Sequence, residues 1–159
     1  MNHVNRIGRA LGLALLLLSA SQVRADGLLL GAGAGVGSAF GQTYYEVGGR
    51  LGYDVGLGLT PEVGVSLWRG ASPGFVEVSP GLTWYLPVPF IRPYVGGFYA
   101  HDFLDAGLPD QDALGLRGGV GLMGVGPVSI DIGVAWERRL SCSVDCDTWW
   151  PEISAGLRF

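Results

Sequence analysis

Apolar residues alternate with small or polar residues along most of this chain, and the alternation is clearest over residues 128–137. Successive side chains of a β-strand point to opposite faces. The pattern therefore predicts a strand with one apolar face and one face of small or polar residues. The apolar positions in this segment are Val128, Ile130, Ile132, Val134 and Trp136.

The same alternation recurs before and after residues 128–137, and it predicts about eight strands in all. Each is long enough for a tilted crossing of a bilayer, which takes roughly 9–11 residues. The apolar positions of 90–102 do not alternate regularly, so the pattern leaves the phase of this strand open. The predicted strands cover residues 28–37, 43–54, 57–68, 74–86, 90–102, 113–122, 128–137 and 149–159.

The predicted connections alternate between short turns and longer or more polar loops. This asymmetry is typical of outer-membrane barrels, which have short periplasmic turns and longer extracellular loops. The short turns are expected at 54–56, Pro87–Pro89 and Gly124–Pro127, and the longer loops at 38–42, 69–73, 102–112 and 140–147.

Prolines inside four of the predicted strands argue against this interpretation, because a closed barrel has no edge where a missing N–H is free. Each proline should mark a bulge or a strand end. These residues are Pro61, Pro80, Pro93 and Pro151.

The two predicted faces differ in a way that favours a membrane barrel. One face carries mostly Gly, Ala and Ser with a few charges, which suits the narrow interior of an eight-stranded barrel. Only 15% of the chain is charged, whereas a soluble surface carries charges at roughly 25–35% of positions. The apolar face carries aromatic residues near its strand ends, as bilayer interfaces favour. These are Tyr53, Trp84 and Phe159 at one end and Tyr45, Trp136 and Trp149 at the other.

We therefore predict an all-β fold, a closed up-and-down antiparallel transmembrane β-barrel of about eight strands, over residues 26–159. Residues 1–25 are expected to be a cleaved signal peptide, since Arg6 and Arg9 precede a short apolar stretch and Val23-Arg24-Ala25 resembles a cleavage site. The alternatives are an uncleaved N-terminal anchor and, for the barrel, a soluble exported ligand-binding β-barrel with its apolar face inward.

Charge and cysteine content narrow the function. Three of the ten basic residues and none of the 14 acidic ones precede residue 26, and the chain has no lysine. Nucleic acid is not expected as a partner, because phosphates need basic clusters. Cys142 and Cys146 are expected to form a disulfide after export. A metal site is not expected, since His101 is the only histidine after residue 25.

The inward face carries several charged residues, which we interpret as ion pairs that fill the lumen. Eight strands leave an interior just wide enough for side chains, so a pore or proton path is the less favoured hypothesis. Hairpin geometry predicts that Arg50 pairs with Glu62 and Arg117 with Asp131. The predicted lumen charges are Glu46, Arg50, Glu62, Glu77, Arg117, Asp131, Glu137, Glu152 and Arg158.

The C-terminal segment Ile153-Ser154-Ala155-Gly156-Leu157-Arg158-Phe159 resembles the signature strand of bacterial outer-membrane proteins. Residues 26–159 as a whole resemble the small eight-stranded barrels of the OmpA/OmpX type. The resemblance implies location in the outer membrane, contact with its lipids and recognition by the barrel-assembly machinery. The assembly signal would then comprise Ile153, Ala155, Leu157 and Phe159. A monomer is expected.

Some barrels of this size are lipid A-modifying enzymes, and the barrel deacylases carry a His-x-Ser pattern. Here His101 is followed at position 103 by phenylalanine, so the pattern fails, and we expect no enzymatic activity and no cofactor. The favoured function is a structural, adhesive or protective role exercised through the outer loops. A lipid-modifying enzyme or a narrow transporter, which would use His101 and the lumen carboxylates, is the alternative.

Overall fold

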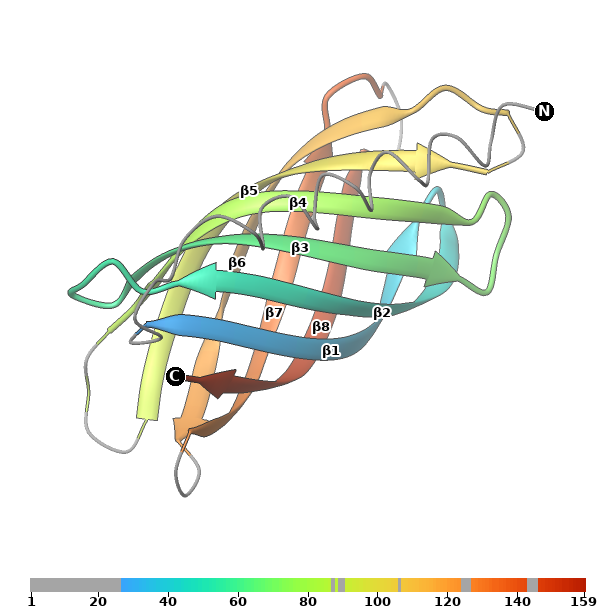
Figure 1. Ribbon diagram of the computed structural model, residues 1–159. Helices are drawn as coiled ribbons and strands as arrows, with labels where there is room; N and C mark the ends of the chain where they lie inside the picture. Colours follow the sequence, from blue (N-terminus) through green and yellow to red (C-terminus); the bar gives the residue numbers. More distant parts are fainter. Residues whose placement is uncertain (1–26, 87, 89–90, 106, 124–126, 143–145) are drawn as a thin grey trace.

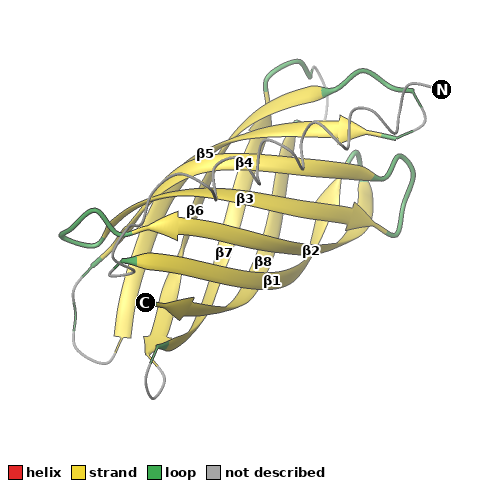
Figure 2. Cartoon of the chain, viewed as in Figure 1, coloured by secondary structure: helices red, strands yellow, loops and turns green. Residues whose placement is uncertain are grey.

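A computed structural model shows one closed barrel of eight antiparallel strands in sequence order (Figure 1). The structure describes residues 27–86, 88, 91–105, 107–123, 127–142 and 146–159. Strands and loops make up this part of the chain (Figure 2). The strands are β1 (Leu28–Ala39), β2 (Gln42–Tyr53), β3 (Leu59–Arg69), β4 (Phe75–Tyr85), β5 (Ile91–Leu104), β6 (Gln111–Met123), β7 (Val128–Arg139) and β8 (Asp147–Arg158).

The predicted fold class is confirmed: β1 pairs with both β2 and β8, so the sheet has no free edge. One end of the barrel holds the C-terminus and the β2–β3 turn, and we call it the turn end (Figure 1). The opposite end, which we call the loop end, holds the connections that follow β1, β3, β5 and β7. The turns predicted at Pro87–Pro89 and Gly124–Pro127 fall mostly outside the described residues, as does the predicted signal peptide.

The structure fixes the phase of β5, which the sequence pattern left open. Tyr94, Phe98 and Asp102 are buried inside the barrel, whereas Tyr99 is exposed on its outside. The inward row of this strand thus mixes aromatic and charged residues and includes Gly96. Because both of its rows contain aromatic residues and glycine, hydrophobicity alone does not distinguish the two faces of this strand.

The four strand prolines lie where a hydrogen-bond ladder to one neighbour is missing, which removes the objection to a closed barrel. On β3, pairing with β2 begins only after Pro61. On β5, pairing with β4 begins only after Pro93, and on β8, pairing with β1 begins only after Pro151. On β4, pairing with β5 is interrupted at Pro80. No residue is inserted at these points, so the prolines are accommodated by local loss of pairing rather than by bulges.

The predicted long loop at 38–42 is wrong, because β1 and β2 are joined by a two-residue turn formed by Phe40 and Gly41. Both residues have positive φ, 53° and 69°, as a tight hairpin turn requires. Phe40 accepts this conformation while its ring packs edge-on against Tyr44 and Phe75. This connection is the shortest at the loop end, so the two ends differ less in loop length than the sequence predicts.

The outer surface of the barrel is apolar. Large hydrophobic side chains are exposed on every strand, and the predicted apolar row of β7 faces outward, with Ile132 51% exposed. All six aromatic residues predicted for the two rims face outward as well. A soluble barrel would bury this row. Within the described part of the chain, no helix is long and apolar enough to span a bilayer.

The interior contains two aromatic clusters that the sequence analysis did not predict. The larger one lies toward the loop end and the smaller one toward the turn end. Inward glycines make room for these rings: a Cβ on Gly115 would lie 2.1 Å from Cζ of Phe98. The larger cluster is built around Tyr44, Trp68, Phe75, Phe98 and Trp150, and the smaller one contains Leu29, Tyr85 and Tyr94.

Candidate functional site

The middle of the lumen holds a network of charged residues centred on Glu62 of β3. Its side chain is 2% exposed, and its carboxylate lies 3.9 Å from Nη1 of Arg50 and 3.6 Å from Nη1 of Arg117. The hydroxyl of Thr83 donates a 2.7 Å hydrogen bond to the same carboxylate. One carboxylate thus balances two guanidinium groups that reach it from different strands.

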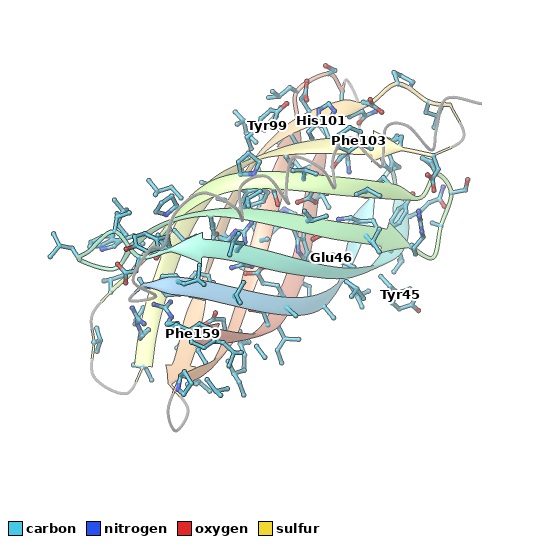
Figure 3. The ribbon with its side chains drawn as sticks, viewed as in Figure 1. Tyr45, Glu46, Tyr99, His101, Phe103 and Phe159 are labelled. Carbon is cyan, nitrogen blue, oxygen red and sulfur yellow. A yellow bond between two sulfur atoms is a disulfide. The ribbon has the colours of Figure 1, made fainter. Side chains whose placement is uncertain are left out.

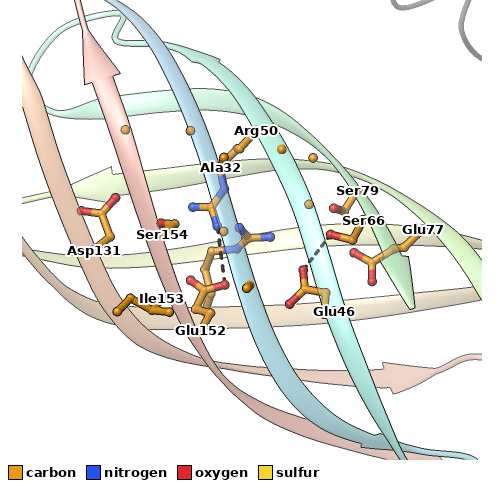
Figure 4. A pocket seen from close by; sticks show the side chains of 18 of the residues that line it. Ala32, Glu46, Arg50, Ser66, Glu77, Ser79, Asp131, Glu152, Ile153 and Ser154 are labelled. Carbon is orange, nitrogen blue, oxygen red and sulfur yellow. Dashed lines mark hydrogen bonds and ion pairs between the residues drawn. The ribbon is translucent and has the colours of Figure 1, made fainter. Parts of the chain in front are cut away.

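A second carboxylate, Glu152 of β8, extends this network across the barrel. Nη2 of Arg50 lies 3.5 Å from Glu152 Oε2 (Figure 4). The hydroxyl of Tyr94 donates a 3.0 Å hydrogen bond to Oε1 of the same carboxylate. On the other side, Ser66 donates a 2.7 Å hydrogen bond to Glu46. A cavity of about 50 Å³ is lined in part by Glu46, Arg50, Ser66 and Glu152. Since one water occupies about 10–15 Å³ on this measure, the cavity has room for a few waters.

The predicted pair of Arg117 with Asp131 is wrong. In the β6–β7 register, Arg117 lies opposite Ala135, whereas Asp131 lies opposite Gly121. The two side chains therefore lie at different heights in the barrel, and the guanidinium of Arg117 stacks at 4.4 Å over the ring of Phe98 and reaches Glu62 instead. The prediction required residues 117 and 131 to be near partners, whereas the observed register places the partner of Arg117 four residues further along β7, at Ala135.

A second group of buried charges lies toward the loop end. Arg139 lies 3.9 Å from Asp102 and 3.5 Å from Glu137, and its guanidinium stacks 4.1 Å from the ring of Phe40. Glu77 accepts a 3.1 Å hydrogen bond from Nε1 of Trp68. Asp102 and Arg139 were not among the predicted lumen charges, because the phase of β5 was open and β7 was predicted to end at residue 137.

The nine lumen charges expected from the sequence all face the interior. At the turn end, Arg158 lies 4.0 Å from Asp54 and stacks over the ring of Tyr85. Tyr44, Trp68 and Phe75 in the larger aromatic cluster are each no more than 1% exposed, and so is Tyr85 in the smaller one. In the described residues, packed aromatic rings therefore lie on both sides of the charged network centred on Glu62. We refer to this arrangement as the sealed lumen.

The outside of the barrel carries one group of polar residues with potential chemistry. His101 of β5 lies directly opposite Asp112 of β6, and its Nδ1 lies 2.7 Å from Asp112 Oδ1. Tyr99 donates a hydrogen bond to the same oxygen, and the ring of Phe103 contacts His101 edge-on. Figure 3 shows Tyr99, His101 and Phe103 close together near the loop end.

His101 is not paired with the carboxylate that follows it in the sequence. The adjacent Asp102 faces the lumen, so it lies on the other side of the sheet. The acidic partner comes instead from the next strand, and only the strand register identifies it. An imidazole held in this way through Nδ1 has Nε2 free to accept a proton. Val78 and Phe103 beside it carry no hydroxyl or thiol, and the phenolic hydroxyl of Tyr99 donates to Asp112.

The predicted disulfide is confirmed. Cys142 and Cys146 are bonded in the β7–β8 connection, with their Cα atoms 5.4 Å apart. The backbone N–H of Arg139 also donates to the carbonyl of Cys146. The disulfide therefore lies next to the end of β7 and the start of β8. No group of three or more His, Cys, Asp or Glu suited to hold a metal ion occurs among the described residues.

These features define a class of protein: an eight-stranded barrel with an apolar outer surface and a polar interior that lies between two clusters of buried aromatic residues. No protein-family model and no curated protein sequence matches the chain. Solved structures do match its fold, and they include outer-membrane β-barrels.

The chain is similar to the N-terminal β-barrel domain of Pseudomonas aeruginosa OprF, with a TM-score of 0.67 and 15% identity over 82% of this chain and 97% of that one. It is similar to Neisserial surface protein A, with a TM-score of 0.60 and 16% identity over 83% and 96% of the two chains. It is also similar to the outer-membrane enzyme PagL, with a TM-score of 0.54 and 13% identity over 81% and 99%. The chain therefore has the eight-stranded outer-membrane β-barrel fold.

Proposed function

We propose that this protein is an integral outer-membrane barrel without an open pore, which holds its loop-end connections at the cell surface for a structural, adhesive or protective role. The observation that carries the proposal is the sealed lumen inside an apolar exterior. The exterior suits lipid, because its side chains are apolar and the closed barrel leaves no free strand edge. The interior offers ion pairs and packed rings in place of a path for solutes.

The loop end is the side we assign to the cell exterior. It carries the longest connection, between β7 and β8, together with its disulfide. The turn end holds the C-terminus, in keeping with an even number of strands that begins and ends in the periplasm. Export by a signal peptide at residues 1–25 and recognition of the C-terminal strand by the assembly machinery complete the proposed route to the membrane. In that strand Ile153, Leu157 and Phe159 face outward.

The test combines location with conductance. After expression in a Gram-negative host, the protein should be in the outer-membrane fraction, and its mobility on a gel should shift on boiling. In planar bilayers it should produce no stepwise conductance. Recovery from the soluble periplasm would instead favour a soluble ligand-binding barrel, and reproducible channel openings would favour a transporter.

A lipid-modifying enzyme is the second candidate, and the His101–Asp112 pair is the observation that favours it. The pair faces outward near the loop end, where the membrane interface would lie, and its histidine is oriented as a general base requires. The adjacent Phe103 occupies the position where the deacylase pattern would have serine, so a water molecule would have to be the nucleophile. Release of fatty acid from outer-membrane lipid that is abolished by His101→Ala, in a variant that still shows the gel shift on boiling, would establish this activity.

A further inference from the structure

The outer surface of the barrel has a hollow between β6, β7 and β8. Its volume is about 190 Å³, and its side chains are apolar. The hollow exists because Gly118 has no side chain in an outward row whose other members are large. The lining residues are Leu116, Gly118, Val134, Trp136 and Trp149, with part of Arg117.

Two tryptophans form one wall of this hollow. Trp136 and Trp149 are direct partners in the β7–β8 register, and their ring centroids are 6.4 Å apart. Both belong to the aromatic rim toward the loop end, where tryptophan marks the bilayer interface. The hollow therefore begins at the level of the lipid headgroups and runs toward the middle of the membrane.

A cation lies directly beyond the tryptophans. Arg138 is the next outward residue after Trp136 on β7, and it is exposed. Its guanidinium has no ion-pair or hydrogen-bond partner among the described residues. Asp147 lies opposite Arg138 on β8 and would repel an anion. An anion would therefore approach Arg138 from the side of β6, where Leu114 is the neighbour of Arg138.

We propose that this hollow binds one membrane lipid with an anionic phosphate headgroup. An acyl chain lies along Gly118 between Leu116 and the two tryptophans, and the phosphate accepts hydrogen bonds from Arg138. The charge complementarity follows from the chemistry of the guanidinium, whose paired N–H groups match phosphate oxygens. The inference rests on the proposed position of the barrel in the membrane. It adds a defined lipid site to a surface that would otherwise contact lipids without selectivity.

Gly118 and Arg138 each have a matched control elsewhere on the barrel. A Cβ on Gly118 would meet only the carbonyl of Tyr94, at 3.5 Å, so Gly118→Leu should fold and fill the hollow. Gly49 is also outward, on β2, and a Cβ there would meet only a carbonyl at 3.6 Å. Arg69 is an outward cation of the loop end that is already paired with Asp105 at 2.8 Å.

The experiment is native mass spectrometry of the folded full chain in detergent micelles, titrated with dioleoyl phosphatidic acid and, separately, with dioleoyl phosphatidylcholine. One phosphatidic acid should bind with preference. Gly118→Leu should weaken binding of both lipids, whereas Arg138→Gln should weaken that of phosphatidic acid roughly five- to tenfold, about the value of one charge-assisted contact. Gly49→Leu and Arg69→Gln should bind like the parent protein.

Equal effects of Gly118→Leu and Gly49→Leu would overturn the site, and so would unchanged lipid preference in Arg138→Gln. Each preparation is first checked for the gel shift on boiling, which reports the folded membrane barrel. A protein that shows this shift but binds lipid without selectivity contradicts this inference alone. A protein that never inserts into membranes contradicts the proposed function.

Discussion

Arg117 of β6 and Glu62 of β3 form an ion pair across the interior of the barrel, with Nη1 3.6 Å from Oε1. The two strands are not neighbours in the sheet. The contact therefore ties opposite parts of the wall together, in addition to the backbone ladders. Glu62 also lies 3.9 Å from Arg50, so its negative charge offsets two buried positive charges.

Removal of that charge should be costly. In Glu62→Gln the hydrogen bond from Thr83 can persist, but the two guanidinium groups lose their shared counter-ion. We expect a loss of roughly 3–5 kcal/mol in the free energy of unfolding, the usual cost of breaking a buried pair. Urea unfolding in lipid vesicles, followed by tryptophan fluorescence, measures the loss. Glu46→Gln, which keeps its contact with Ser66, is the control, and an equal loss there would show that Glu62 is not central.

The free-energy cost of a charge in the outward row of β7 should depend on the depth of its position in the bilayer. Ile132 lies midway along this strand, whereas Val128 is its first residue at the turn end. Ile132→Arg should cost roughly 2–4 kcal/mol and Val128→Arg roughly 0–1 kcal/mol, because the cost falls toward the interface. The same vesicle unfolding assay compares the two variants. Equal costs at the two positions would contradict the assigned membrane level.

The fold was predictable from the sequence because the alternation is strong on most strands. On β7 a period of two fixes the face of every residue, and the observed row is the predicted one. The phase of β5 was not predictable, since Phe98 and Tyr99 are adjacent aromatic residues that face opposite sides. A single sequence contains no signal that separates a ring in a sealed lumen from a ring in a lipid-facing rim.

The polar contacts were less predictable than the strands, because they depend on register. His101 and Asp112 meet because their strands pair at those residues, and no spacing rule places them together. Arg117 reaches Glu62 rather than Asp131 for the same reason. Long side chains in a lumen also cross to strands that are distant in the sequence, so a hairpin argument finds only neighbours.

Packing of the larger aromatic cluster depends on an inward glycine. A Cβ on Gly115 would lie within 2.6 Å of three ring atoms of Phe98. Gly115→Ala should therefore destabilise the barrel by roughly 1–3 kcal/mol, the usual cost of overpacking. Gly31→Ala is the control, since its nearest atoms would be 3.7 Å away. The same unfolding assay applies.

A double-mutant cycle identifies the cause of that loss. If the clash with the ring is responsible, Gly115→Ala should cost less when Phe98 is already leucine, with a coupling energy of roughly 0.5–3 kcal/mol. Additive effects would show that the strain lies in the backbone of β6 instead.

The disulfide between Cys142 and Cys146 should shape the loop without holding the barrel. Only three residues separate the two cysteines, so the bond removes little entropy from the unfolded chain. The double variant Cys142→Ser, Cys146→Ser should still insert into membranes and shift its mobility on boiling. Its protease sensitivity should rise only in the β7–β8 connection, which limited proteolysis with mass mapping detects. Free thiols that titrate in the untreated folded protein would contradict the bond, and failure of the double variant to fold would show that the loop stabilises β7 and β8 far more than its size suggests.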